Sequence, residues 1–185
     1  MYRERMETLK EWKVSKNRKP LIIRGARQVG KTWLMKEFGK LYYEKCAYIN
    51  FDNNSRMDIL FNEEFDLNRI IQGLKIESGI NIEPENTLII FDEIQETPNA
   101  LKALKYFYEN ANEYHIVAAG SLLGVAMHQG TSFPVGKVNF MDLMPLSFFE
   151  FLDALGQDHL LNLLKNIEFD MISVFNNKYK DYLKL

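Results

Sequence analysis

A short apolar run followed by a glycine-framed loop constrains the fold of this chain more than any other feature. Residues 21–23 are Leu-Ile-Ile, a run typical of a buried strand, and residues 25–32 read Gly-Ala-Arg-Gln-Val-Gly-Lys-Thr. This is the G-x-x-x-x-G-K-[ST] pattern of a phosphate-binding loop. Residues 33–38 then carry apolar side chains at helical spacing. The motif therefore has the strand, loop and helix order that phosphate binding requires.

The residue types in this loop suit the binding of a nucleotide. Gly25 and Gly30 allow a tight turn without a Cβ in the way, so successive N–H groups can point into one concavity. The positive end of the following helix adds to the attraction for an anion. We expect Lys31 to contact the β- and γ-phosphates and the Thr32 hydroxyl to bind Mg²⁺. The predicted nucleotide-binding residues are Gly25, Ala26, Gln28, Val29, Gly30, Lys31, Thr32 and Trp33.

A second informative stretch is residues 87–93, Thr-Leu-Ile-Ile-Phe-Asp-Glu. Its apolar run predicts a central parallel strand covered on both faces, with Asp92 and Glu93 at its carboxyl end. Ligands of doubly wound sheets bind beyond the carboxyl ends of the strands. We expect Asp92 to hold Mg²⁺ through its water shell and Glu93 to orient or deprotonate an attacking water. The alternative is a surface acidic pair that caps the next segment.

Residues 115–121, His-Ile-Val-Ala-Ala-Gly-Ser, form another short apolar run that ends in a hydroxyl. Ser121 can contact the γ-phosphate or the attacking water from this strand end, or it can cap a helix that begins at Leu122. His115 lies at the opposite end of the run, so we expect it to be structural, as we do His128 and His159.

Composition narrows the class of protein. The chain has 185 residues, 46% of them hydrophobic, which suits one domain with a small appendage. It contains no apolar run of the roughly 20 residues needed for a membrane span, and its charged N-terminus does not resemble a secretory signal. Cys46 is the single cysteine and cannot form an internal disulfide. We therefore expect a cytoplasmic protein with no membrane partner, in which Cys46 is a small apolar residue.

Charge is distributed unevenly along the chain. The net charge is −2, but residues 1–45 contain 13 Lys and Arg against 5 Asp and Glu. This basic segment indicates either a surface that faces nucleic acid or a solvated first helix combined with the phosphate-binding loop.

Hydrophobic periodicity and turn residues predict the remaining elements. Ser147 and Glu150 have the spacing of a capping box at a helix start. Besides the elements above, we expect helices at 3–14, 56–61, 66–77, 98–110 and from 158 onward, and strands at 47–52 and 138–144. We assign residues 1–156 to one domain and 157–185 to a helical segment, a remnant or truncated start of a second domain.

Five segments together resemble one family of prokaryotic AAA-like P-loop ATPases: RGARQVGKTWLMKEF, TLIIFDEIQETPNALKALKYF, AAGSLLGVAM, SFPVGKV and PLSFFEFL. The resemblance covers nearly the whole chain up to about Leu155. It implies an α/β P-loop NTPase fold of three αβα layers, with an additional strand and a parallel sheet of order 5-1-4-3-2. It also implies ATP as the ligand, with Gly25 to Thr32 in phosphate binding, Asp92 and Glu93 in metal binding and water activation, and Ser121 as a sensor.

One departure from related ATPases is the absence of any arginine after Arg69. A late arginine often stabilises charge on the transferring phosphoryl group, an effect worth roughly 10³ to 10⁵ in rate. Lys137 is the late cation best placed in sequence to substitute, although lysine lacks the planar fork of arginine. Alternatively, another subunit or a partner protein supplies the charge and Lys137 is a solvated loop residue.

The sequence thus predicts an ATP-binding protein that hydrolyses ATP with Mg²⁺ and is slow when isolated. GTP is disfavoured because the nearest match to the N-K-x-D guanine pattern, residues 177–180, fails at its fourth position. Two alternatives are a nucleotide-gated interaction module with little turnover and a DNA-associated ATPase. A homo-oligomer or a complex with a partner protein is compatible with each.

Overall fold

The computed structural model describes residues 3–62, 65–120, 134, 136–166 and 169–184. The chain forms two compact units. The larger is Arg5–Pro145, and the smaller combines Met1–Glu4 with Leu146–Leu185.

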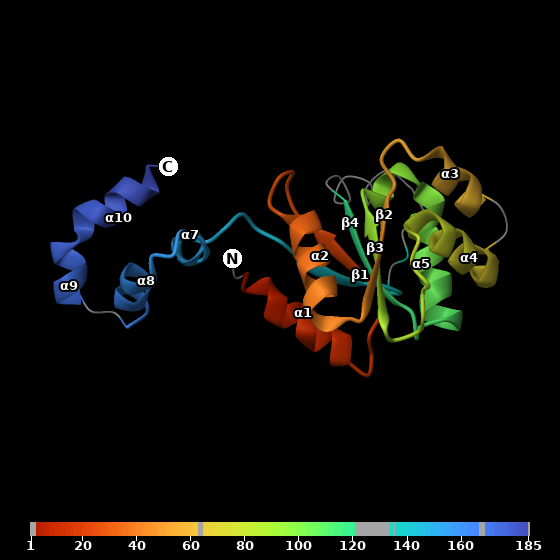
Figure 1. The fold of residues 1–185 in the computed structure, drawn as a ribbon, viewed down its shortest axis with the longest axis horizontal. Helices are drawn as coiled ribbons and strands as arrows, with labels where there is room; N and C mark the ends of the chain where they lie inside the picture. The colour runs from red at the N-terminus through yellow and green to blue at the C-terminus, as the bar shows by residue number, and fades with distance from the viewer. Residues whose placement is uncertain (1–2, 63–64, 121–133, 135, 167–168, 185) are drawn as a thin grey trace. The chain divides into compact units, whose positions relative to one another are not determined.

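Five parallel strands form the sheet of the larger unit (Figure 1). Their order is β2-β3-β4-β1-β5, which is the predicted order 5-1-4-3-2 read from the other edge. The predicted α/β P-loop NTPase sheet is therefore confirmed. Because all pairings are parallel, the carboxyl ends of all five strands lie at the same end of the sheet. The strands are β1 (Leu21–Arg24), β2 (Lys45–Asn50), β3 (Thr87–Asp92), β4 (His115–Gly120) and β5 (Asn139–Asp142).

Helices cover both faces of this sheet, giving three layers (Figure 1). α1 and α2 pack on one face, and α3, α4 and α5 pack on the other. None of the helices in the described ranges has both the length and the apolar content needed to cross a bilayer. The helical elements are α1 (Arg5–Val14), α2 (Lys31–Tyr42), α3 (Ser55–Asn62), α4 (Leu67–Ser78), the 3₁₀ turn η1 (Ile94–Glu96) and α5 (Pro98–Asn110).

The central strands supply the core on both faces. Every residue of β3 and β4 is buried. On β3, Leu88 and Ile90 pack toward α1 and α2, whereas Ile89 and Phe91 pack toward α3, α4 and α5. This alternation follows from the two-residue period of a strand, and it explains the unbroken apolar run in the sequence.

β2 ends earlier than the sequence predicts. The expected strand runs to Asp52, but the observed strand ends at Asn50. The Phe51 N–H still donates to the Asp92 carbonyl, at 3.0 Å. Asn53 then adopts a left-handed conformation with φ 52°, which turns the chain away from the sheet. Asp52 consequently lies beyond the strand end, at the edge where the phosphate-binding loop lies.

The smaller unit is helical. Its helices are α7 (Phe148–Ala154), α8 (Asp158–Lys165), α9 (Phe169–Val174) and α10 (Asn176–Leu183). The predicted capping box at Ser147 and Glu150 is present, with both reciprocal hydrogen bonds formed. Glu150 is buried and also forms an ion pair with buried Arg3, at 3.2 Å. Leu152, Leu160, Leu161 and Tyr179 form the core of this unit.

His115 opens β4 at the end of the sheet opposite the phosphate-binding loop. The ring is 5% exposed, and its Nδ1 lies 2.7 Å from the Tyr43 hydroxyl. Trp12 packs edge-on against it. Burial, reinforced by the positive charges of Arg18 and Lys13, lowers the pKa of His115 from 6.5 to about 4. The environment is that of a structural histidine held neutral.

This buried histidine makes the larger unit sensitive to acid. Between pH 6.5 and pH 4 the unfolded chain binds a proton at His115 that the folded chain excludes, so stability falls as the pH is lowered. We expect His115 to contribute a loss of roughly 1–3 kcal/mol across this window. Urea unfolding at a series of pH values should show a flatter pH dependence for His115→Gln than for the wild type. The exposed His159→Gln serves as the control, and identical slopes in the wild type and His115→Gln would contradict this prediction.

Candidate functional site

The phosphate-binding loop is shaped by two fixed points. A Cβ at Gly25 would lie 2.3 Å from the Leu143 carbonyl oxygen, so only glycine fits where the loop leaves β1. Val29 is buried in the core under α1 and α2. Gly30 then adopts φ 92°, a conformation that favours glycine, and α2 begins at Lys31. Between these anchors, residues 26–28 are exposed.

Lys31 is buried at the first turn of α2. Its Nζ donates to the Gly25 carbonyl at 2.9 Å and to the Ala26 carbonyl at 2.7 Å. Burial lowers the pKa of this ammonium below its usual value, and the negative charges of Glu93 and Asp92 oppose that shift. The side chain is thus a desolvated cation placed against the loop and near two carboxylates.

Asp92, the last residue of β3, is 4% exposed. Its Oδ2 accepts hydrogen bonds from the Thr32 hydroxyl at 2.7 Å and from the Tyr48 hydroxyl at 3.0 Å. Burial and the negative charge of Asp92 raise the pKa of Tyr48, so this phenol stays a donor. Asp92 Oδ1 is buried and has no hydrogen-bond partner among the described residues. A buried carboxylate oxygen left over beside a threonine hydroxyl fits a hydrated Mg²⁺, whose preferred ligands are oxygens.

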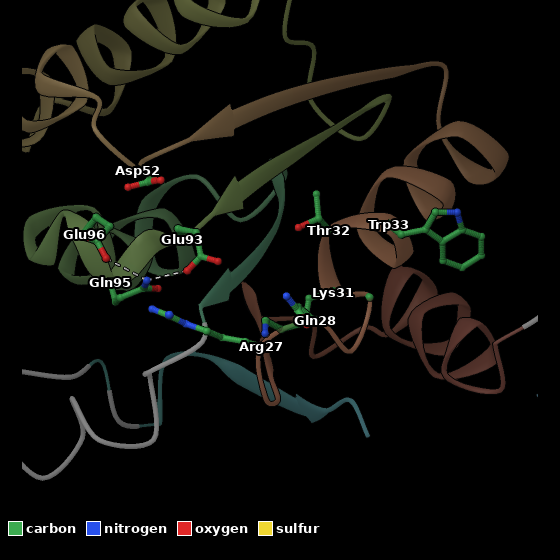
Figure 2. Close-up of a pocket in the computed structure, with 10 residues that line it drawn as sticks. Arg27, Gln28, Lys31, Thr32, Trp33, Asp52, Glu93, Gln95 and Glu96 are labelled. Carbon is green, nitrogen blue, oxygen red and sulfur yellow. Dashed lines mark hydrogen bonds between the residues drawn. The ribbon is translucent and has the colours of Figure 1, made fainter. Parts of the chain in front are cut away.

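Glu93 follows directly and has a strained backbone. Its φ of 53° lies in the left-handed region, which is uncommon for residues other than glycine and recurs at functional sites. Its Oε2 accepts a hydrogen bond from Gln95 Nε2 at 2.7 Å (Figure 2). The turn η1 thus fixes the Glu93 carboxylate next to the cavity described below.

A cavity of about 630 Å³ opens beside these groups (Figure 2). This volume is within the usual range for sites that bind small molecules and cofactors. The loop forms one part of its wall, and the residues that follow β2 and β3 form another. The lining residues are Arg27, Gln28, Gly30, Lys31, Thr32, Trp33, Asp52, Glu93, Gln95 and Glu96.

The structure brings most of the predicted site residues together. Five of the eight predicted nucleotide-binding residues line the cavity, as does Glu93. The backbone carbonyls of Gly25 and Ala26 contact Lys31, and Val29 is directed into the core, so these three contribute to the loop itself. Asp92 is not among the lining residues, but it accepts a hydrogen bond from Thr32, which is.

Two predicted residues are not part of this cluster. Lys137 comes just before β5, at the end of the sheet where the strands begin. Its Nζ pairs with Glu109 Oε1 at 2.8 Å. This placement does not fit the prediction that Lys137 substitutes for a late arginine. The phosphate-binding loop follows β1, so parallel pairing puts it at the opposite end of the sheet, where the strands finish. Ser121 lies outside the described residues, as does His128.

Five residues at the site are not among the individually predicted site residues. Arg27 is inside the loop motif, and Gln95 and Glu96 follow the Asp92-Glu93 pair, so position in the chain could have indicated them. Tyr48 and Asp52 share a face of the predicted second strand. The pairing of β2 with β3 brings Tyr48 into hydrogen-bond contact with Asp92, and Asp52, beyond the end of β2, lines the cavity. That pairing is not readable from the spacing of residues.

Two solved structures share the fold. A Walker-type ATPase of Pyrococcus abyssi is 16% identical with a TM-score of 0.54, over 92% of this chain and 62% of that one. The structure of Drosophila ORC bound to DNA is 19% identical with a TM-score of 0.57, over 96% of this chain and 53% of that one. This chain therefore spans less than two thirds of either protein. At this level of sequence identity, the similarity shows a shared fold.

The sequence comparisons give the family. No curated protein matches the chain. Residues 17–152, which contain the loop, the sheet and the acidic pair, match the AAA domain family. The glycine-framed loop at the end of β1, the acidic pair at the end of β3 and the order of the sheet agree with that match. The chain belongs to the AAA domain family of P-loop ATPases.

Proposed function

We propose that this chain binds ATP with Mg²⁺ and hydrolyses it, with slow turnover in the isolated chain. The observation that supports this most is the 2.7 Å hydrogen bond between Thr32 and Asp92 beside the 630 Å³ cavity. It brings the end of the phosphate-binding loop and the acidic strand end to one point, with Glu93 on the cavity wall. Such an arrangement suits a metal-bound triphosphate.

Phosphate binding falls to the loop and the start of α2. The N–H groups of the loop and the helix N-terminus attract phosphate oxygens. Lys31 would exchange the carbonyls of Gly25 and Ala26 for β- and γ-phosphate oxygens. The exchange is favourable because a charged pair with phosphate replaces two neutral acceptors.

Magnesium would bind at Thr32 and Asp92. No group of three or more His, Cys, Asp or Glu side chains among the described residues could hold a metal ion. Mg²⁺ is commonly held by one or two protein oxygens, waters and substrate phosphates, which fits this pair. When bound, the ion neutralises charge on the β- and γ-phosphates.

Glu93 is the proposed base. A water oxygen forms a bond to the γ-phosphorus, and the bond between that phosphorus and the β–γ bridging oxygen breaks. The electron pair of the broken bond leaves with ADP, and the proton of the water passes to the Glu93 carboxylate. Gln95 is a positioning residue, because its amide donates to Glu93 Oε2.

Replacing Lys31 tests the phosphate site. In Lys31→Ala the cavity loses a charge-assisted contact worth about 1.5–3 kcal/mol, so we expect ATP to bind at least about tenfold more weakly. Isothermal titration calorimetry with Mg²⁺ and ATP measures this. Lys40→Ala, an exposed change on the same helix, is the matched control. Equal affinity in Lys31→Ala and the control would argue against a nucleotide at this loop.

Replacing Glu93 tests the base. We expect Glu93→Gln to keep its ATP affinity within about threefold and to lose roughly 10²- to 10⁴-fold in kcat, because an amide cannot accept the proton. Phosphate release and equilibrium binding are measured on the same preparation. If Glu96→Gln lost turnover and Glu93→Gln did not, Glu96, which also lines the cavity, would take this role.

A nucleotide-gated interaction module is the second candidate. It is favoured by the position of Lys137, which leaves no late cation of the described chain at the cavity. Single-turnover phosphate release separates the two candidates. ATP held intact for hours would favour the module, and multiple turnovers would favour the ATPase.

DNA association finds less support. Several cations of the basic segment 1–45 have partners within the chain. Arg24 pairs with Asp142 at 2.9 Å and Lys45 with Glu83 at 2.8 Å. A steep fall in DNA affinity as the salt concentration rises would support this function.

A further inference from the structure

The proposed ATPase lacks an assigned cation for the transferring phosphoryl group. The chain has seven arginines, none after Arg69. Five of the seven are held by partners away from the cavity. These partners are Glu150 for Arg3, backbone carbonyls for Arg18, Asp142 for Arg24, Glu77 for Arg56 and the Leu60 carbonyl for Arg69.

Arg27 is the one arginine among the residues that line the cavity. It is the third residue of the phosphate-binding loop, and its side chain is exposed. In Figure 2 the side chain extends from the loop toward Gln95 and Glu96, on the side where Glu93 lies. Lys31, the other cation of the loop, instead folds back onto the carbonyls of Gly25 and Ala26. The two loop cations therefore serve different parts of the cavity.

The backbone that carries Arg27 is held in place. On one side, Gly25 is in such close approach to the Leu143 carbonyl that no Cβ fits. On the other, Val29 is buried in the core. The guanidinium can thus reorient while the backbone that carries it stays in place. Binding a ligand therefore costs less conformational entropy than it would for a cation on a mobile loop.

The negative charges that line the cavity act on the side chain of Arg27. Asp52, Glu93 and Glu96 line the same cavity. These carboxylates attract the guanidinium to the Glu93 side of the cavity, where the attacking water would be. The planar guanidinium can donate to two oxygens at once, which suits the equatorial oxygens of a γ-phosphoryl group in transfer.

We propose that Arg27 is the catalytic cation of this site, supplied by the phosphate-binding loop itself. It contacts the γ-phosphoryl oxygens and stabilises their charge as the bond to the β–γ bridging oxygen breaks. This role replaces a late arginine and makes a cation from a second subunit unnecessary. The inference rests on the ATPase function proposed above.

The test compares ground-state binding with transition-state binding. The variants are Arg27→Ala, Arg27→Lys and the control Arg56→Gln, which changes an exposed arginine paired with Glu77. Three quantities are measured for each: the Kd for ATP with Mg²⁺, the Kd for ADP with Mg²⁺ and aluminium fluoride, and kcat.

For Arg27→Ala we expect kcat to fall by about 100-fold or more, because arginines in this role are worth roughly 10³ to 10⁵ in rate. Affinity for the aluminium fluoride complex should fall in parallel, while the Kd for ATP changes less than about threefold. Arg27→Lys should keep part of the activity, and millimolar guanidinium should restore part of the kcat of Arg27→Ala. The control should match the wild type in all three quantities.

Other outcomes overturn the inference. Equal weakening of ATP and the aluminium fluoride complex would make Arg27 a ground-state contact. An unchanged kcat in Arg27→Ala would remove it from the reaction, and activity rising with protein concentration would assign the cation to a second copy. If the wild type failed to bind or hydrolyse ATP, the ATPase proposal itself would fail, which is distinct from the loss of Arg27 alone.

Discussion

Parallel pairing across β3, β4 and β1 is the constraint on which the site depends. It places the carboxyl ends of all three strands at one edge of the sheet. β1 and β3 are not neighbours, so their ends are separated by two strand spacings, about 10 Å. The Thr32 hydroxyl nevertheless reaches Asp92 Oδ2 at 2.7 Å. It does so because α2 begins directly after the loop and packs over the face of the sheet, which brings its first turn above the end of β3.

Burial of charge at this edge is compensated locally. Asp92 is almost fully buried but receives two hydrogen bonds on one oxygen, and Lys31 is buried but donates to two carbonyls. Leaving either group unpaired would cost several kcal/mol. Except for the Tyr48 bond, the partners belong to the loop and to the first turn of α2. A ligand can therefore replace them without disturbing the core.

The cavity has walls of opposite charge. Its loop side carries Arg27 and Lys31, and its opposite side carries Asp52, Glu93 and Glu96. A triphosphate between them would be held by the loop. The carboxylates of the opposite wall would accept a proton, or hydrogen bonds from metal-bound water. This division of charge gives the ATPase proposal a physical basis. The positive charge of the loop faces carboxylates across the cavity, so it does not by itself indicate a nucleic-acid-binding surface. The carboxylates that balance it come from distant parts of the chain.

Local patterns in the sequence determined the loop, the buried strands and most helix boundaries. The glycines of the loop, the four-residue apolar run before Asp92 and the capping box at Ser147 act through nearest neighbours, so their spacing was sufficient. Only the tertiary structure decided which groups share the cavity. It placed Arg27 and Asp52 in the same cavity as Glu93, and it paired Lys137 with Glu109 at the opposite end of the sheet. The family resemblance implied the strand order, but the direction of each side chain depends on packing between residues far apart in the chain, which residue spacing does not encode.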